Sequence, residues 1–232
     1  MNRNTAHENR ANWITSPALG AEQVPPRDAH SIYRMTKRVF DLVVALLGIG
    51  LLSPVFLIVA SLIKIESRGP VLFKQTRVGL ARQPIQIWKF RKMRNDLPTQ
   101  GPMLTMQNDR RMTRVGKFLE RTKLDELPQL FNVVRGDMSI VGPRPEVPKF
   151  IEYYPEKWDD VLSVKPGIFG ASQNHFRDES KLYPPREENI EAYYIRSILP
   201  VMLELDIAYV RRRGMAVDVG LLLQGIARVL FH

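Results

Sequence analysis

Hydrophobic and polar residues are distributed unevenly along the chain, and one apolar stretch is unusually long. Residues 42–63, LVVALLGIGLLSPVFLIVASLI, contain no charged side chain. As one α-helix they would extend roughly 33 Å, enough to cross a hydrocarbon core of about 30 Å. The length permits a transmembrane helix, while a buried helix of a soluble protein is an alternative.

Two features of this segment favour a helix that enters the membrane and returns. Ser53-Pro54 lies at its middle, where proline removes a helical hydrogen bond and kinks or breaks a helix. Basic residues flank the segment on both sides: Arg34, Lys37, Arg38, Lys64 and Arg68. Because positive flanks stay on the cytoplasmic side, both ends would prefer that side. A re-entrant helix–break–helix satisfies both features.

The polar pattern changes after residue 69. The stretches VLFKQTRVGL and QPIQIWKFRKM alternate apolar and polar residues around a glycine-bearing turn, which predicts a β-hairpin. Lys89 and Arg91 should share one face of the second strand, opposite Trp88 and Phe90. These two cations form either a solvated strand edge or an anion-binding face.

Helical spacing follows in DRRMTRVGKFLERTKLDE and in PQLFNVV. Proline disfavours helix in the residue before it, so the first helix should end near Leu127 and the second should begin at Pro128. Gly136 is its expected terminator. Asp125 and Glu126 therefore lie at a helix junction.

This junction carries the candidate chemistry. A helix N-terminus favours ionised carboxylates and also attracts phosphate. Two adjacent carboxylates, Asp125 and Glu126, are suited to Mg²⁺, which takes oxygen ligands and shares them with substrate phosphates; otherwise they only cap a helix. Arg144, between Pro143 and Pro145, is either a phosphate-binding guanidinium or part of a surface turn.

Composition limits the classes of binding partner and of metal site. The formal net charge of +10 and pI of about 10 indicate a polyanion: nucleic acid, anionic lipid or a phosphorylated substrate. The absence of cysteine excludes disulfides and thiolate metal sites. The polar, turn-rich N-terminal residues lack a signal-peptide pattern and are interpreted as a flexible arm.

Taken together, these stretches resemble one family. KRVFDLVVALLGIGLLSPVF, VLFKQTRVGL, IWKFRKM, LDELPQLFNVVRGDMSIVGPRP, VKPGIFG and LELDIAYV, spread over residues 37–210, are similar to the monotopic phosphoglycosyl transferases. These are bacterial polyprenyl-phosphate sugar-1-phosphate transferases, here in a short form. The resemblance implies transfer of a sugar 1-phosphate from a UDP-sugar to undecaprenyl phosphate, with release of UMP. It also implies a role at the first membrane step of a surface glycan, capsule, exopolysaccharide or glycoprotein pathway.

Residue roles are implied by the same motifs. Asp125 matches the family nucleophile, which forms a phosphosugar–aspartyl intermediate, and Glu126 joins it in holding Mg²⁺. The pair Ser53 and Pro54 matches the family's helix break. The implied phosphate- and substrate-binding residues are Lys89, Arg91, Arg144, Gln129, Gln173 and Arg177.

Several positions depart from the family pattern. KFRKM places Lys92 where Thr or Ser is usual, and Glu120 stands where a basic residue is common. KPGIFGASQ differs from the usual RPGITGWAQ at Phe169, Ala171 and Ser172, which affects the expected sugar and uridine contacts. None of these departures removes the nucleophile.

These observations predict an α+β protein: a flexible arm (1–32), a re-entrant membrane helix (33–68) and a compact, mainly helical catalytic domain (69–232) with a small hairpin and interfacial amphipathic helices. The last helix could pack in the core or lie on the membrane surface. The expected location is the cytoplasmic face of the bacterial inner membrane, in contact with membrane lipids. The sequence is compatible with a homo-oligomer. A non-enzymatic basic module bound to anionic membrane or nucleic acid fits poorly. It does not explain the Asp-Glu-Leu-Pro junction at residues 125–128, and aromatic and basic residues are not interleaved as in RNA-binding proteins. An enzyme of the same class that spans the membrane is the other alternative.

Overall fold

The computed structural model describes residues 27–94, 111–176, 183 and 189–231. Within them the protein is α+β and mostly helical, with a two-stranded antiparallel hairpin, as the sequence predicted. Most of the predicted arm and the candidate residue Arg177 lie outside the described residues. Helix α2 begins at Arg27, inside the segment interpreted as the arm.

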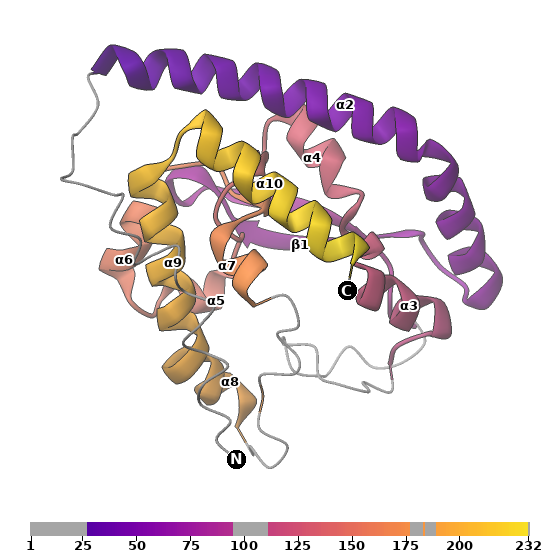
Figure 1. The fold of residues 1–232 in the computed structure, drawn as a ribbon. Coiled ribbons are helices and arrows are strands. Elements are labelled where there is room, and N and C mark those ends of the chain that lie inside the picture. The colour runs from indigo at the N-terminus through magenta and orange to yellow at the C-terminus, as the bar shows by residue number, and fades with distance from the viewer. Residues whose placement is uncertain (1–26, 95–110, 177–182, 184–188, 232) are drawn as a thin grey trace, which may run out of the picture.

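The long apolar segment belongs to α2 (Arg27–Glu66), which continues through Pro54. The prediction of two helices separated by a break was therefore wrong; α2 instead bends in its C-terminal part (Figure 1). Proline has no N–H for the carbonyl four residues earlier, which here belongs to Gly50. The Ser53 hydroxyl donates to that carbonyl at 2.9 Å, so it supplies the hydrogen bond that Pro54 cannot make.

The N-terminal half of α2 packs on the folded domain. Arg38 donates to the carbonyls of Val133 and Val134 at 2.7 and 2.9 Å. Buried Asp41 accepts hydrogen bonds from the Ser139 hydroxyl and the Ile140 N–H, both at 3.0 Å. These polar contacts fasten the beginning of α2 to α4 (Gln129–Arg135) and β3 (Ser139–Val141).

The C-terminal half of α2 packs on the same domain, beyond the bend. Val59 and Ile63 are buried in a cluster with Phe90 and Leu119. Two backbone N–H groups at the start of α3 (Arg114–Thr122) donate to the Glu66 carboxylate at 2.6 and 2.8 Å. Both halves of α2 are therefore attached to one body.

The predicted hairpin is confirmed as β1 (Leu72–Val78) and β2 (Pro84–Phe90), joined through the short turn η1 (Leu80–Arg82). Helix α3 ends at Thr122, earlier than the predicted Leu127, because Lys123 adopts a left-handed conformation with φ of 60°. The 3₁₀ turn η2 (Leu124–Glu126) follows, and α4 begins after Pro128 and ends at Gly136, whose φ of 90° favours glycine. These limits of α4 agree with the sequence prediction.

The remaining chain contains two short strands that the sequence did not reveal. Strand β3 pairs in parallel with β4 (Gly167–Phe169), and α7 (Ala171–His175) follows it. The other helices are α5 (Pro148–Ile151), α6 (Pro155–Val161), α8 (Ile190–Tyr193), the π-helical turn η4 (Tyr194–Ile198), α9 (Leu199–Arg212) and α10 (Met215–Leu230). Helix α10 buries Leu221 and Leu222 and exposes Leu223 and Ile226. It thus contributes to the core and also presents an apolar outer face.

Candidate active site

One face of the hairpin forms a wall of the candidate site. Antiparallel partners project to the same face, and the pairing of Gln75 with Ile87 places Arg77 and Lys89, two residues away on either strand, on that face too. Arg77 donates to Gln75 Oε1 and pairs with Glu146 at 3.0 Å. The face therefore presents two cations, one on each strand.

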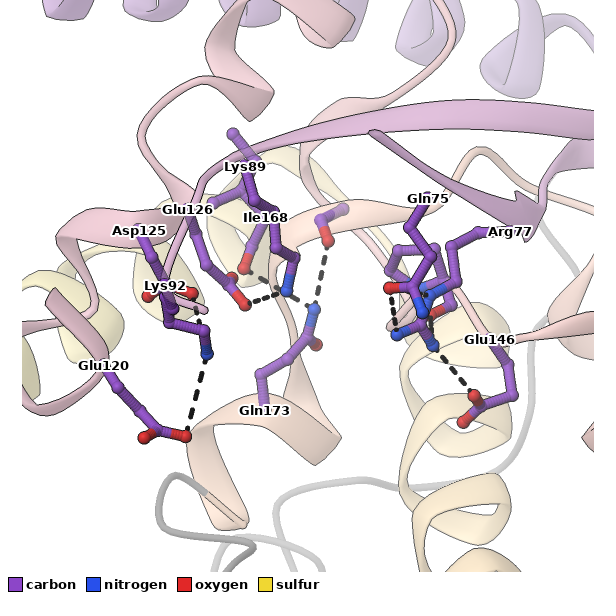
Figure 2. A network of polar contacts seen from close by, with 12 residues as sticks. Gln75, Arg77, Lys89, Lys92, Glu120, Asp125, Glu126, Glu146, Ile168 and Gln173 are labelled. Carbon is purple, nitrogen blue, oxygen red and sulfur yellow. Dashed lines mark hydrogen bonds and ion pairs between the residues drawn. The ribbon is translucent and has the colours of Figure 1, made fainter. Parts of the chain in front are cut away.

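The two predicted catalytic acids lie in η2, opposite this face. The side chain of Lys89 reaches Glu126, with Nζ 2.7 Å from Oε1. Asp125 is only 2% exposed, and its Oδ2 lies 3.1 Å from Nζ of Lys92. Figure 2 shows the two lysines facing the neighbouring carboxylates, with Glu120 beyond Lys92. Each acid is therefore paired with its own lysine.

Neighbouring charges shift the pKa values of Glu126 and Lys92 toward their charged forms. Burial alone would raise the pKa of Glu126, but Lys89 and Arg144 outweigh burial and hold that pKa well below its usual value. Burial would lower the pKa of Lys92, yet Asp125 and Glu120 outweigh it and raise that pKa. At neutral pH, Glu126 is therefore an anion and Lys92 a cation.

A pocket opens beside the acids. Its wall includes Arg77, Lys89, Glu126, Gln129, Arg144 and Gln173. Gln173 donates to the Gly167 carbonyl at 3.0 Å, whereas its buried Oε1 has no hydrogen-bond partner. Three cations, two amides and one carboxylate in one pocket suit a ligand that carries phosphate groups and hydroxyls.

The structure brings together most of the predicted site residues. Lys89, Glu126, Gln129, Arg144 and Gln173 line the pocket, and Asp125 is adjacent to Glu126 in the same turn.

The structure places Arg91 elsewhere. Its guanidinium donates to the carbonyls of Ser67 and Arg68 at 2.8 and 2.5 Å, and to the Ser67 hydroxyl. Arg91 follows the last residue of β2, so strand alternation no longer determines where its side chain points. It holds the chain after α2 and does not line the pocket.

Sequence reasoning missed Arg77 as a pocket residue. A signal was present, because Arg77 and Lys89 are an even number of residues apart, on opposite sides of the hairpin turn. Only the register, in which Val78 pairs with Pro84, shows that both project to one face.

Asp206 contacts the backbone of Arg144, which lines the pocket. It is buried in α9, and the hydroxyl and the N–H of Ser172 donate to its carboxylate at 2.9 and 3.2 Å. The backbone N–H of Arg144 also donates to it. Burial raises the pKa of Asp206 to about 7, although these hydrogen bonds act in the opposite direction. Asp206 therefore links the chain at Arg144 and the start of α7 to α9.

The donor set for a metal is small. The described residues contain no group of three His, Cys, Asp or Glu side chains that could hold a metal ion. Asp125 and Glu126 offer two carboxylates, each with one oxygen in a lysine ion pair. Two carboxylates fit Mg²⁺ when substrate phosphates and water complete its coordination. They are not a complete protein cage for the ion.

Comparison with known proteins identifies the family. The model of the bacterial sugar transferase family matches residues 32–232. The chain belongs to this family. It is 42% identical over 178 residues to UDP-glucose:undecaprenyl-phosphate glucose-1-phosphate transferase of Escherichia coli K12, covering 74% of this chain and 38% of that protein. It is 53% identical over 145 residues to the exopolysaccharide production protein PSS of Rhizobium leguminosarum bv. phaseoli, covering 59% of this chain and 72% of that protein.

A further relative has a different sugar in its name. The putative undecaprenyl-phosphate N-acetylgalactosaminyl 1-phosphate transferase of Bacillus subtilis 168 is 43% identical over 122 residues, covering 53% of this chain and 68% of the relative. The chain spans about two fifths of the two UDP-glucose relatives from Escherichia coli and Klebsiella pneumoniae, 38% and 43% of their lengths. Relatives of similar identity thus carry the names of different sugars.

Proposed function

We propose that this sugar transferase moves a sugar 1-phosphate from a UDP-sugar to undecaprenyl phosphate and releases UMP. The observation that carries the proposal is the η2 turn, where Asp125 and Glu126 are paired with lysines beside a cationic pocket. The names of the relatives from Escherichia coli and Klebsiella pneumoniae describe the same transfer with glucose 1-phosphate. The relative named for exopolysaccharide production supports a role at the first membrane step of a surface polysaccharide.

The proposed chemistry has two displacements at one phosphorus atom. A carboxylate oxygen of Asp125 attacks the β-phosphorus of the UDP-sugar, and the bond to the bridging oxygen breaks. UMP leaves with that electron pair, and the sugar phosphate remains as an acyl phosphate on Asp125. A phosphate oxygen of undecaprenyl phosphate then attacks the same phosphorus, and Asp125 leaves as a carboxylate.

Protein cations are suited to stabilise the charge in both displacements. Lys89, Arg77 and Arg144 line the pocket, and fixed cations stabilise phosphoryl transfer without reorganisation during the reaction. Asp125 and Glu126 are the residues proposed to hold Mg²⁺. The ion, when bound, supplies further neutralisation of the diphosphate. Gln129, in the pocket wall, is proposed to donate a hydrogen bond to the substrate, and the unpartnered Oε1 of Gln173 is proposed to accept one from a substrate hydroxyl.

We also propose that α2 dips into the cytoplasmic leaflet of the inner membrane and returns. The described residues contain one helix apolar enough to cross a membrane, and only 11% of its most apolar window is buried, which argues against a core helix. Its exposed apolar residues include Leu46, Leu47, Leu51, Leu57 and Ile58.

Attachment of both halves of α2 to one domain supports this topology. Asp41 and Glu66 lie on the two sides of the uncharged segment 42–63, and both accept hydrogen bonds from backbone N–H groups of that domain. A straight span would separate these ends by a hydrocarbon layer of about 30 Å.

Kinetics with defined substrates test the proposed function. A panel of UDP-sugars that includes UDP-glucose and UDP-N-acetylgalactosamine is incubated with undecaprenyl phosphate and Mg²⁺, and UMP is measured. We expect one preferred sugar, ping-pong kinetics, and label trapped on the protein when labelled UDP-sugar is added alone. Intersecting initial-rate lines would contradict the covalent intermediate, and absence of UMP with every sugar would contradict the transfer itself.

A further inference from the structure

Helix α3 packs unusually closely on the chain that follows β2. A Cβ atom at Gly116 would lie 2.0 Å from the Lys92 carbonyl oxygen, so only glycine permits this approach. The N–H and the hydroxyl of Thr113 both donate to that carbonyl, at 3.0 and 3.2 Å. The backbone of Lys92 is therefore fixed against the first turn of α3.

This packing determines where the Lys92 side chain ends. Glu120 lies one helical turn after Gly116, on the same face of α3. Nζ of Lys92 lies 3.1 Å from Oδ2 of Asp125 and 3.7 Å from Oε1 of Glu120 (Figure 2). The side chains of Lys92 and Asp125 are 19% and 3% exposed, so little water screens the shorter ion pair.

We propose that Lys92 is a positioning residue for the nucleophile, holding Oδ2 of Asp125 so that Oδ1 faces the substrate. This inference rests on the proposed function, in which Asp125 attacks phosphorus. Attack by one anion on another is opposed by charge, and a cation on the carboxylate reduces that repulsion. A carboxylate anchored through one oxygen also loses less rotational freedom in the transition state.

The ion pairs of Lys92 suggest a way to move its charge between two positions. Nζ of Lys92 lies between Oδ2 of Asp125 and Oε1 of Glu120, at 3.1 and 3.7 Å, so the position 120 side chain ends beside the same cation. We infer that the cation for Asp125 comes from position 92 in this protein, and that position 120 on α3 is close enough to supply it instead.

Four variants of the full chain test this inference. Lys92→Met keeps the apolar stem and removes the charge, and Lys92→Arg keeps the charge. The double variant Lys92→Thr with Glu120→Arg moves the cation to α3. Lys117→Met, at an exposed position of the same helix, is the control for loss of one positive charge. UMP release is measured with the UDP-sugar that wild type prefers, and thermal unfolding is measured for every variant.

We expect Lys92→Met to lower kcat on the order of ten- to a hundredfold, the usual effect of losing a hydrogen bond to a charged group, with a smaller change in KM. Lys92→Arg and Lys117→Met should stay within about threefold of wild type, far less than one lost charge-assisted bond. The double variant should recover at least about half of the lost activity on a logarithmic scale. A role in packing alone would not be restored by moving the charge.

The inference would be overturned if Lys92→Met were as active as wild type. It would also be overturned if the double variant were no more active than Lys92→Met. Should Lys92→Met fail to fold, Lys92→Arg and the double variant decide: loss of activity in both, with folding intact, overturns the inference. Failure of the proposed function is distinguishable, because wild type would then release no UMP.

Discussion

Two clusters of paired charges in this protein differ in how completely protein groups surround their acids. The first, here called the fastening cluster, lies between α2, α9 and α10 and consists of Tyr33, Lys37, Asp41, Tyr209 and Asp218. Tyr33 and Tyr209 donate to the two oxygens of Asp218 at 2.9 and 2.8 Å. Lys37 lies 3.0 Å from Asp218 and 3.6 Å from Asp41. Asp218 is fully buried, so this cluster holds the helices together.

The proposed catalytic cluster contains Asp125 and Glu126, and protein groups surround these acids less completely. Among the described residues, each of these carboxylates has one oxygen at ion-pair distance from a lysine. Glu126 also lines the pocket, and Asp125 is adjacent to it in the same turn. Removing one partner from a completely paired buried acid destabilises the fold, whereas a half-paired acid beside a pocket is suited to chemistry.

The largest expected effect is on Asp125. Asp125→Asn keeps the shape of the side chain and removes the nucleophilic charge, so UMP release should fall by at least about a thousandfold. The melting temperature should change little. The control Asp160→Asn removes an exposed acid of α6 and should keep activity. Substantial UMP release by Asp125→Asn would contradict the assigned nucleophile.

The fastening cluster should respond in the opposite way. Asp218→Asn leaves the buried Lys37 without its nearest anion, which should reduce stability by about 3 kcal/mol, as for other broken buried pairs. Thermal unfolding in detergent measures this loss. The kcat of the folded protein should remain near wild type, because Asp218 does not line the pocket. A large loss of kcat without a loss of stability would remove the distinction between the clusters.

Asp206 should make the free energy of unfolding depend on pH. Its folded-state pKa of about 7 lies above the ordinary value of 3.8, so the folded state binds the proton more tightly between these values. The stability that this group contributes is therefore complete below about pH 4 and is lost as the pH rises to about 7, at about 1.4 kcal/mol per pKa unit.

Asp206→Asn should remove this dependence. Denaturant unfolding at about pH 5 and about pH 7.5 should show a smaller pH difference in the variant than in wild type. Equal pH differences in both proteins would show that another group is responsible.

The smallest expected effect concerns the bend in α2. Ser53→Ala with Pro54→Ala restores helix propensity at mid-segment, and should shift a minor population toward a full span. Because both halves of α2 are fastened to the domain, adding Asp218→Asn should enlarge that population. A single cysteine at Ala18 reports the side of the arm, since the chain has no native cysteine. Labelling of the wild-type arm only from the periplasm would contradict the re-entrant topology.

The sequence predicted the elements whose signals are local. Pro128 and Gly136 set the two ends of α4 through their own backbone preferences. Alternating residues predicted the hairpin, and the adjacent acids Asp125 and Glu126 were placed correctly at the turn before α4.

The sequence did not predict the end of α3 or the strands β3 and β4, because contacts between residues far apart in the chain determine them. Helix α3 ends early because the chain turns at Lys123 to pack Leu124 and Leu127 on the cluster beneath α2. The strands β3 and β4 have three residues each and were missed, since parallel strands so short carry little periodic signal.

By itself the sequence determined the residue types on which the proposed chemistry depends: two adjacent acids, an arginine between prolines, and a long uncharged segment with Ser53-Pro54 at its middle. Only the tertiary structure decided the partners. It turned Arg91 toward the end of α2, brought Arg77 to the pocket, and placed Lys92 between Asp125 and Glu120. The physical reason is that side-chain pairing depends on hairpin register and helix packing, which form between segments far apart in the chain.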